Sequence, residues 1–126
     1  MYVAEDAELE FLLNLDSVSY EAAAGYVVEF SAKRVPATKQ RPHGIAYSLV
    51  LRPSRGGGPF VRFDNAHSVP HHGGRHVRRQ AARDHWHRTE NDAGRPYTFT
   101  TASQLLEDFW REVKRTLDEK GIPHDL

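Results

Sequence analysis

The sequence contains no cysteine, so disulfide bonds and thiolate metal sites are both excluded. It has no apolar run near the roughly 20 residues that a membrane-spanning helix needs, and its start, MYVAEDAELE, does not resemble a secretory signal. A GxxxxGK phosphate loop, a GxSxG nucleophile elbow and internal repeats are also missing. These absences predict a single cytoplasmic domain over residues 1–126, large enough to bury its own core.

Charge is balanced over the whole chain but unevenly distributed along it. Residues 1–32 hold seven acidic residues and neither lysine nor arginine. Between Arg52 and Arg95 the balance reverses, with nine arginines against four acidic residues. Such a segment either forms a local positive field that attracts a phosphate-bearing ligand or is an ordinary solvated loop.

Hydrophobic periodicity predicts an α+β fold with an antiparallel sheet over about residues 8–65. Leucines that alternate with other residues predict a first strand over residues 9–15, and small polar residues predict a break over residues 17–24. Further strands are expected over residues 26–35, 45–51 and 60–65. A long His/Arg-rich segment over residues 66–95 and a short strand over residues 96–100 follow.

The C-terminal segment predicts an amphipathic helix over residues 101–120 that packs on one face of the sheet. Thr101 and Gln104 have the spacing of a capping box, and Gly121 suits the C-terminal end. Apolar residues recur at helical spacing between these ends: Leu105, Leu106, Phe109, Trp110, Val113 and Leu117.

Histidines are concentrated in one stretch. Six of the eight lie between residues 62 and 99: His67, His71, His72, His76, His85 and His87. The HxH pair formed by His85 and His87 would project both rings from one face of a strand, which suits chelation of one divalent metal or contact with one substrate. A third ligand could come from His67, His71, His72 or His76, with Asp64 or Asp84 as a carboxylate. Such a site without cysteine favours zinc, manganese or iron.

The same residues also suit chemistry that requires no metal. Cleavage of RNA by its own 2′-hydroxyl needs a base, an acid and a cation that stabilises the phosphorane. His85, His87 and Arg88 supply these three groups, and Asp84 could orient one imidazole. The remaining interpretation is a polar loop that serves only solubility or partner contact.

The polar residues come from two segments that are expected to pair. FDN ends one predicted strand, and DHWH is expected to form or adjoin another. Pairing would pack Phe63 and Trp86 inward. It would also bring one set of polar residues into a single cleft: Asp64, His67, Asp84, His85, His87 and Arg88.

Several blocks in the second half of the chain, in this order, resemble the TumE family of toxins. The blocks are Arg62-Phe63-Asp64-Asn65-Ala66-His67, Asp84-His85-Trp86-His87-Arg88, Asp92-Ala93-Gly94-Arg95-Pro96-Tyr97-Thr98-Phe99 and Leu105-Leu106-Glu107-Asp108-Phe109 with Glu112-Val113. The resemblance implies a toxin that is paired with a small helix-turn-helix antitoxin and that attacks RNA or translation. On the matching positions we expect catalytic roles for His67, Asp84, His85, His87 and Arg88, and substrate contacts from Arg62, Asp64, Asn65 and Tyr97. The roles of His71, His72 and His76 stay open.

The sequence therefore predicts a cytoplasmic, ribonuclease-like toxin that uses histidine, aspartate and arginine in acid–base chemistry. Two alternatives stay open: a non-catalytic module that binds an antitoxin or RNA, and a metal-dependent phosphoryl- or nucleotidyl-transfer enzyme. No membrane partner is expected, and a homo-oligomer is compatible with the sequence.

Overall fold

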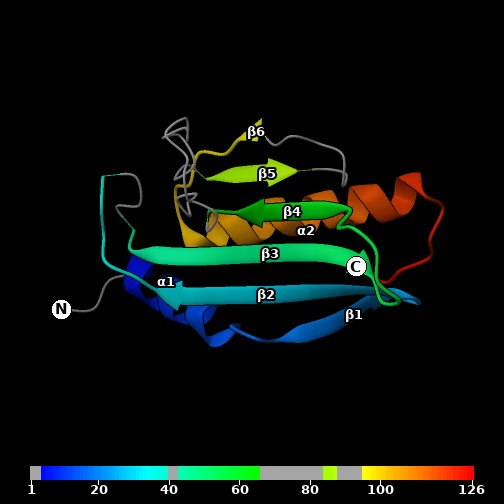
Figure 1. The fold of residues 1–126 in the computed structure, drawn as a ribbon, viewed down its shortest axis with the longest axis horizontal. Helices are drawn as coiled ribbons and strands as arrows, with labels where there is room; N and C mark the ends of the chain where they lie inside the picture. Colours follow the sequence, from blue (N-terminus) through cyan, green and yellow to red (C-terminus); the bar gives the residue numbers. More distant parts are fainter. Residues whose placement is uncertain (1–3, 40–42, 66–83, 88–94) are drawn as a thin grey trace, which may run out of the picture.

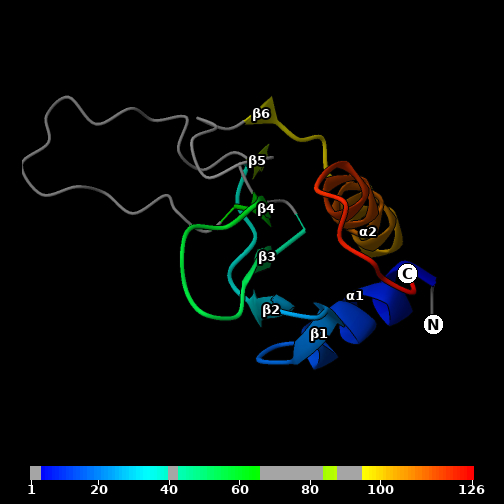
Figure 2. The ribbon, with the colours of Figure 1, turned by 90° about the vertical axis from the view of Figure 1, so that its right-hand side faces the viewer.

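The structure, a computed structural model, describes residues 4–39, 43–65, 84–87 and 95–126. Within these residues six strands form one antiparallel sheet in sequence order, and two helices lie on one side of it (Figures 1 and 2). The strands are β1 (Ser19–Ala23), β2 (Tyr26–Arg34), β3 (Ile45–Pro53), β4 (Val61–Asp64), β5 (His85–His87) and β6 (Arg95–Pro96). The helices are α1 (Ala4–Asn14) and α2 (Ala102–Glu119). The predicted α+β class is confirmed, and none of the described helices is both long and apolar enough to cross a membrane.

Alternation along the central strands produces one apolar face. The register pairs Phe30 with Leu49 and Leu49 with Phe63, so that an apolar row crosses β2, β3 and β4. The rings of Phe30 and Phe63 lie 6.0 Å and 5.9 Å from the ring of Phe109 in α2. The strands predicted over residues 26–35, 45–51 and 60–65 are therefore confirmed, and their apolar face is the one that the helices cover (Figure 2).

Helix α2 has the ends and the buried face that the sequence predicts. The Thr101 hydroxyl accepts a hydrogen bond from the backbone N–H of Gln104 at 3.0 Å, which satisfies one amide of the first turn. Gly121, with a φ of 70°, follows the C-cap residue Lys120. Four apolar residues of the predicted face are fully buried: Leu105, Phe109, Val113 and Leu117.

The strand predicted over residues 9–15 is wrong, because this segment belongs mostly to α1. Alanine, glutamate and leucine dominate α1, and all three have high helix propensity. Leu9, Leu12 and Leu13 stand at i, i+3 and i+4, and Leu12 is fully buried. Phe11 instead lies on the exposed side of the helix, with 58% of its surface accessible. The alternating leucines were one part of a helical pattern.

Two shorter segments also differ from expectation. Most of the break predicted over residues 17–24 is strand β1, which pairs with β2 through a turn at Ala24 and Gly25. Gly25 has a φ of 85°, a conformation that glycine adopts without steric cost. The strand predicted over residues 96–100 is only Arg95–Pro96, because the chain then leaves the sheet toward α2.

Candidate functional site

Strands β4 and β5, far apart in the sequence, lie side by side in the sheet (Figure 1). Their register places the Cα of Asp64 opposite that of His85, Phe63 opposite Trp86, and Arg62 opposite His87. The rings of Phe63 and Trp86 are stacked, with centroids 5.5 Å apart, on the apolar side. The predicted pairing of the FDN and DHWH segments is therefore confirmed.

Arg62 and Asp64 project from the other side of β4, away from the helices. The Arg62 Nε atom lies 2.8 Å from Asp64 Oδ2, so the two side chains form an ion pair. The Asp64 side chain is 12% exposed, whereas 39% of the Arg62 side chain is accessible. The carboxylate thus holds a guanidinium whose planar donors suit a phosphate group.

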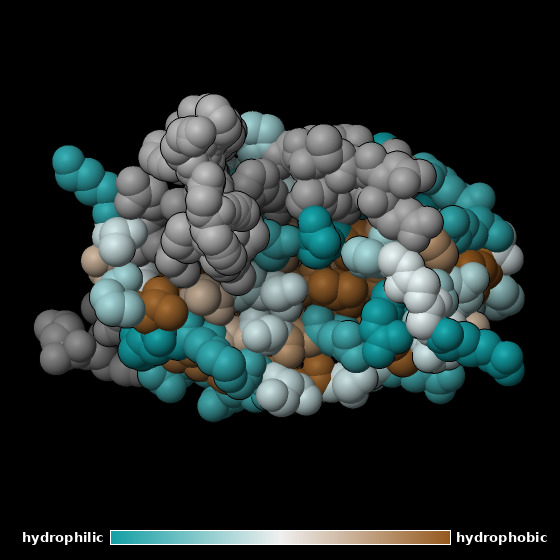
Figure 3. Space-filling model, viewed as in Figure 1, coloured by the Kyte–Doolittle hydropathy of each residue, from teal (hydrophilic) through white to brown (hydrophobic). Residues whose placement is uncertain are grey.

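A row of polar positions crosses the sheet at the level of Asp64. Ser31 pairs with Ser48, Ser48 pairs with Asp64, and Asp64 pairs with His85. On this side of the molecule hydrophilic side chains surround a few hydrophobic ones (Figure 3). This face therefore carries hydroxyl, carboxylate and guanidinium groups.

Asp84 lies on the opposite side of the sheet from Asp64. It precedes β5 by one residue, and neighbouring residues of a strand alternate between the two faces. Its Oδ2 atom accepts a hydrogen bond of 2.7 Å from the hydroxyl of Tyr47, which is buried in the core. The single cleft predicted for Asp64 and Asp84 is therefore wrong.

Tyr47 and His43 complete the surroundings of Asp84. Burial raises the pKa of Tyr47 far above its ordinary value, and the negative charge of Asp84 adds to the shift, so the hydroxyl keeps its proton and donates it in the hydrogen bond. His43 Nε2 lies 3.6 Å from Asp84 Oδ2, and both side chains are less than a tenth exposed. This buried arrangement suits structural support for β5 more than contact with a large substrate.

His43 is a residue that the sequence pattern did not single out. Its Nδ1 atom accepts the backbone N–H of Ile45 at 3.1 Å, and its ring lies 4.2 Å from that of Phe99. The two rings line a cavity of about 180 Å³ near the start of α2. Nothing in the local sequence distinguishes His43, because its neighbours in space come from distant parts of the chain.

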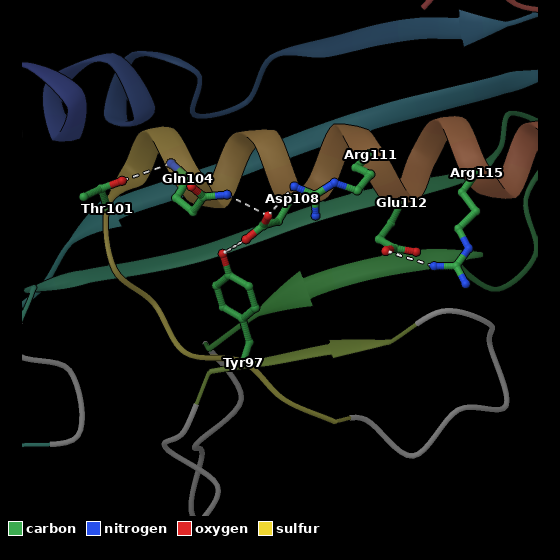
Figure 4. A network of polar contacts seen from close by, with 7 residues as sticks. All are labelled: Tyr97, Thr101, Gln104, Asp108, Arg111, Glu112 and Arg115. Atoms are coloured by element: carbon green, nitrogen blue, oxygen red, sulfur yellow. Dashed lines mark hydrogen bonds and ion pairs between the residues drawn. The ribbon is translucent and has the colours of Figure 1, made fainter.

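Asn65 and Tyr97, both predicted to contact substrate, have their polar side-chain groups hydrogen-bonded within the fold. Asn65 is fully buried: its side chain accepts from the N–H of Tyr47 and donates to the carbonyl of Ile45, each at 2.9 Å. The hydroxyl of Tyr97 donates to Asp108 Oδ2 at 2.6 Å, as Figure 4 shows. Neither polar group is directed toward the face that carries Arg62 and Asp64.

Asp108 connects the chain after β6 to helix α2 (Figure 4). Besides Tyr97, its carboxylate accepts from Gln104 Nε2 at 2.9 Å and lies 2.9 Å from Arg111 Nη2. Burial alone would raise the pKa of Asp108, but hydrogen bonds from Tyr97, Gln104 and Arg111 outweigh it and lower the pKa below 3.8. The carboxylate is therefore charged at neutral pH.

The other predicted site residues are only partly described. His85 and His87 are placed by the backbone register of β5 alone. His67 and Arg88 lie outside the described residues, as do His71, His72 and His76 and most of the His/Arg-rich segment. In the described part of the chain no three histidine, aspartate or glutamate side chains form a group that could hold a metal ion.

Comparison with known proteins identifies one family. The family model described as Toxin TumE matches residues 4–117, which include both helices and all six strands, up to the last turn of α2. No curated protein and no solved structure matches the chain.

Proposed function

The chain belongs to the TumE toxin family, and from that premise we propose that it is a ribonuclease-like toxin whose reactive face is the Arg62–Asp64 side of strands β4 and β5. Membership makes the chain a toxin component of a toxin–antitoxin system. The proposal adds RNA as the substrate, acid–base chemistry as the mechanism and a helix-turn-helix protein as the antitoxin.

The β4–β5 register is the observation that carries the proposal. It places His85 beside Asp64 and His87 beside Arg62 along neighbouring strands. A directly opposed pair of positions shares one face of an antiparallel sheet. Two histidine positions, a carboxylate and a guanidinium are thus supplied by two short strands.

These groups match the needs of RNA cleavage by internal transfer. One imidazole would take the proton of the 2′-hydroxyl, and the resulting oxygen would attack phosphorus while the bond to the 5′-oxygen breaks. The second imidazole would protonate that leaving oxygen. Arg62, held by Asp64, would stabilise the negative charge on the phosphorane. The products are one fragment with a 2′,3′-cyclic phosphate and one with a 5′-hydroxyl.

Asp84 has a different role in this proposal from the one expected from the sequence. Its carboxylate is directed to Tyr47 and His43 on the helix side. We therefore assign Asp84 to positioning β5, and we assign the proton transfers to His85 and His87. His67 and Arg88 stay candidates on their sequence pattern alone.

The chemical nature of the RNA ends tests the proposal. Purified protein is incubated with total cellular RNA, with and without EDTA, and the new ends are mapped and typed. We expect 2′,3′-cyclic phosphate and 5′-hydroxyl ends in equal yield under both conditions, because no step requires a metal.

Two outcomes would contradict the proposal. Ends that carry a 5′-phosphate and appear only without EDTA would indicate metal-dependent hydrolysis. The second outcome is that the purified protein leaves RNA intact although induction of the same chain arrests growth. That result would indicate another toxic activity, or binding to RNA without cleavage. A His124→Ala protein is the matched control, since His124 lies 2.7 Å from Asp118 of α2, on the helix side of the sheet.

A further inference from the structure

An apolar groove lies between α1, β1 and α2. Its volume is about 1380 Å³, and its apolar lining comes from all three elements and the segment between α1 and β1: Phe11, Leu15, Val18, Tyr20, Leu106 and Trp110. Phe11, Val18 and Tyr20 are the large hydrophobic residues that the described structure exposes, at 58%, 39% and 50%. All three line this one groove. A concentration of this kind marks a surface for a partner, because soluble chains seldom leave a large apolar patch uncovered.

The walls of the groove are well supported. The ring of Trp110 meets that of Tyr20 edge-on at 5.9 Å and lies 6.2 Å from the ring of Phe30. Both helices lie on the same side of the sheet, with β1 at its edge (Figure 2). Aromatic side chains held in this way are typical anchors of protein interfaces.

The shape of the groove favours a helix of another protein over a second copy of this chain. In a twofold dimer the same patch meets itself, so two concave surfaces would face each other. The exposed large hydrophobic residues of the described structure line the groove itself, so they offer no separate apolar projection to fill it. An amphipathic helix of about 10–12 Å diameter presents the convex apolar surface that such a groove accepts.

Charges along α2 indicate the polar residues of that helix. Arg111, Lys114 and Arg115 border the groove along the middle of α2, and all three are exposed. Acidic residues border it on either side of this stretch: Glu107 before it, and Asp118 and Glu119 near the end of α2. A bound helix would therefore place acidic residues against Arg111 and Lys114, and a basic residue against the acidic end.

We propose that this groove binds an amphipathic helix of the antitoxin, with apolar residues at i, i+3 or i+4 and i+7 and with acidic residues beside them. The inference rests on the antitoxin partner that the family implies, and it does not depend on ribonuclease chemistry. The groove lies on the helix side of the sheet. A helix bound there would anchor the antitoxin without contacting Arg62 or Asp64.

Binding measurements with groove variants test this proposal. The antitoxin is taken as the product of the neighbouring gene whose co-expression restores growth. Its affinity is measured by calorimetry for the wild-type chain, Phe11→Asp, Tyr20→Asp and the control Ala24→Asp. Ala24 is exposed in the turn after β1, outside the groove, so it receives the same charge in the same hairpin as Tyr20.

We expect Phe11→Asp and Tyr20→Asp each to weaken binding by about 30-fold or more, as loss of an interface anchor does. Ala24→Asp should stay within about threefold. Lys114→Glu should weaken binding by about threefold to tenfold, more at low salt than at high salt. Lys114 is exposed, so this variant keeps the test valid even if an aspartate in the groove prevents folding, which thermal melts monitored by circular dichroism would reveal.

Wild-type affinity in all folded groove variants would overturn the proposal. Light scattering on the chain alone could give a second contrary result. If it finds a dimer, and if Phe11→Asp or Tyr20→Asp dissociates that dimer, the groove is the contact surface for a second copy of the chain. Because the readout is binding, a failure here is distinct from a failure to find RNA cleavage.

Discussion

Asn65 follows β4 and continues the hydrogen bonding with β3, as a further residue of the strand would. The backbone N–H of Asn65 donates to the carbonyl of Tyr47 at 3.2 Å, and its side-chain amide pairs with the next backbone groups of β3. These groups are buried, so without the amide they would lose hydrogen bonds in a place that water does not reach. The Asn65 side chain thus satisfies buried backbone groups of β3, while its predicted contact with substrate stays a prediction.

Asn65→Ala is therefore expected to act on stability. Two buried backbone groups would lose their partners, so the free energy of unfolding should fall by about 2–4 kcal/mol. Urea denaturation measures this loss. Ser48 is half-buried on the face of β3 that lies away from the helices, so Ser48→Ala should lower the free energy of unfolding by much less. An Asn65→Ala chain as stable as wild type but unable to act on RNA would return Asn65 to the substrate site.

At the scale of single residues, the sequence predicted side-chain chemistry better than side-chain surroundings. Arg62 and Asp64 form the ion pair that their i, i+2 spacing allows. Asp84 and Tyr97, in contrast, have partners that lie 37 and 11 positions away in the chain. Such partners depend on how the strands and the helix pack together, and the local sequence pattern does not contain this information.

The same distinction holds for whole elements. Helix α2 and strands β2 to β4 were predictable because their apolar residues repeat at one clear period and their ends carry cap or turn residues. Helix α1 was misread because Leu9, Phe11, Leu13 and Leu15 also fit an alternating pattern. Helix propensity and the burial of Leu12 decided its form.

The segment between β6 and α2 depends on the hydrogen bond from Tyr97 to Asp108, so Tyr97→Phe should destabilise the chain by about 1.5 kcal/mol at neutral pH. Because the pKa of Asp108 is lowered in the folded chain, its charged form contributes stability above about pH 4. That contribution is lost as the pH falls through the lowered pKa. The difference between wild type and Tyr97→Phe should therefore be smaller at pH 2.5 than at pH 7.

Urea denaturation at both pH values checks this expectation. Tyr20→Phe is the matched control, since Tyr20 is half-exposed and keeps its edge-on ring contact with Trp110 when the hydroxyl is removed. It should cost little at either pH. An equal loss for Tyr97→Phe at pH 2.5 and at pH 7 would mean that the charge of Asp108 does not contribute to the effect of this hydrogen bond.

At the scale of the whole molecule, the sheet separates the two proposed functions. Its helix side holds the core, the Asp84–Tyr47 support and the apolar groove proposed for the antitoxin. Its other side carries the Arg62–Asp64 pair and the register positions of His85 and His87. Pairing of the two polar segments could be predicted from sequence, whereas their division between two faces could not. Alternation places Asp84 and His85 on opposite sides, but only the register with β4 shows which of them shares a side with Asp64.

Growth arrest by a His87→Ala chain, set beside its thermal melting, tests the proposed reactive face most directly. Loss of a proton-transfer group typically costs about 100-fold or more in rate, so induction of this variant should no longer arrest growth. The purified variant should melt close to wild type, with a change under about 0.5 kcal/mol. His124→Ala should still arrest growth. A His87→Ala chain that melts normally and remains fully toxic would contradict the assignment of RNA cleavage to β4 and β5.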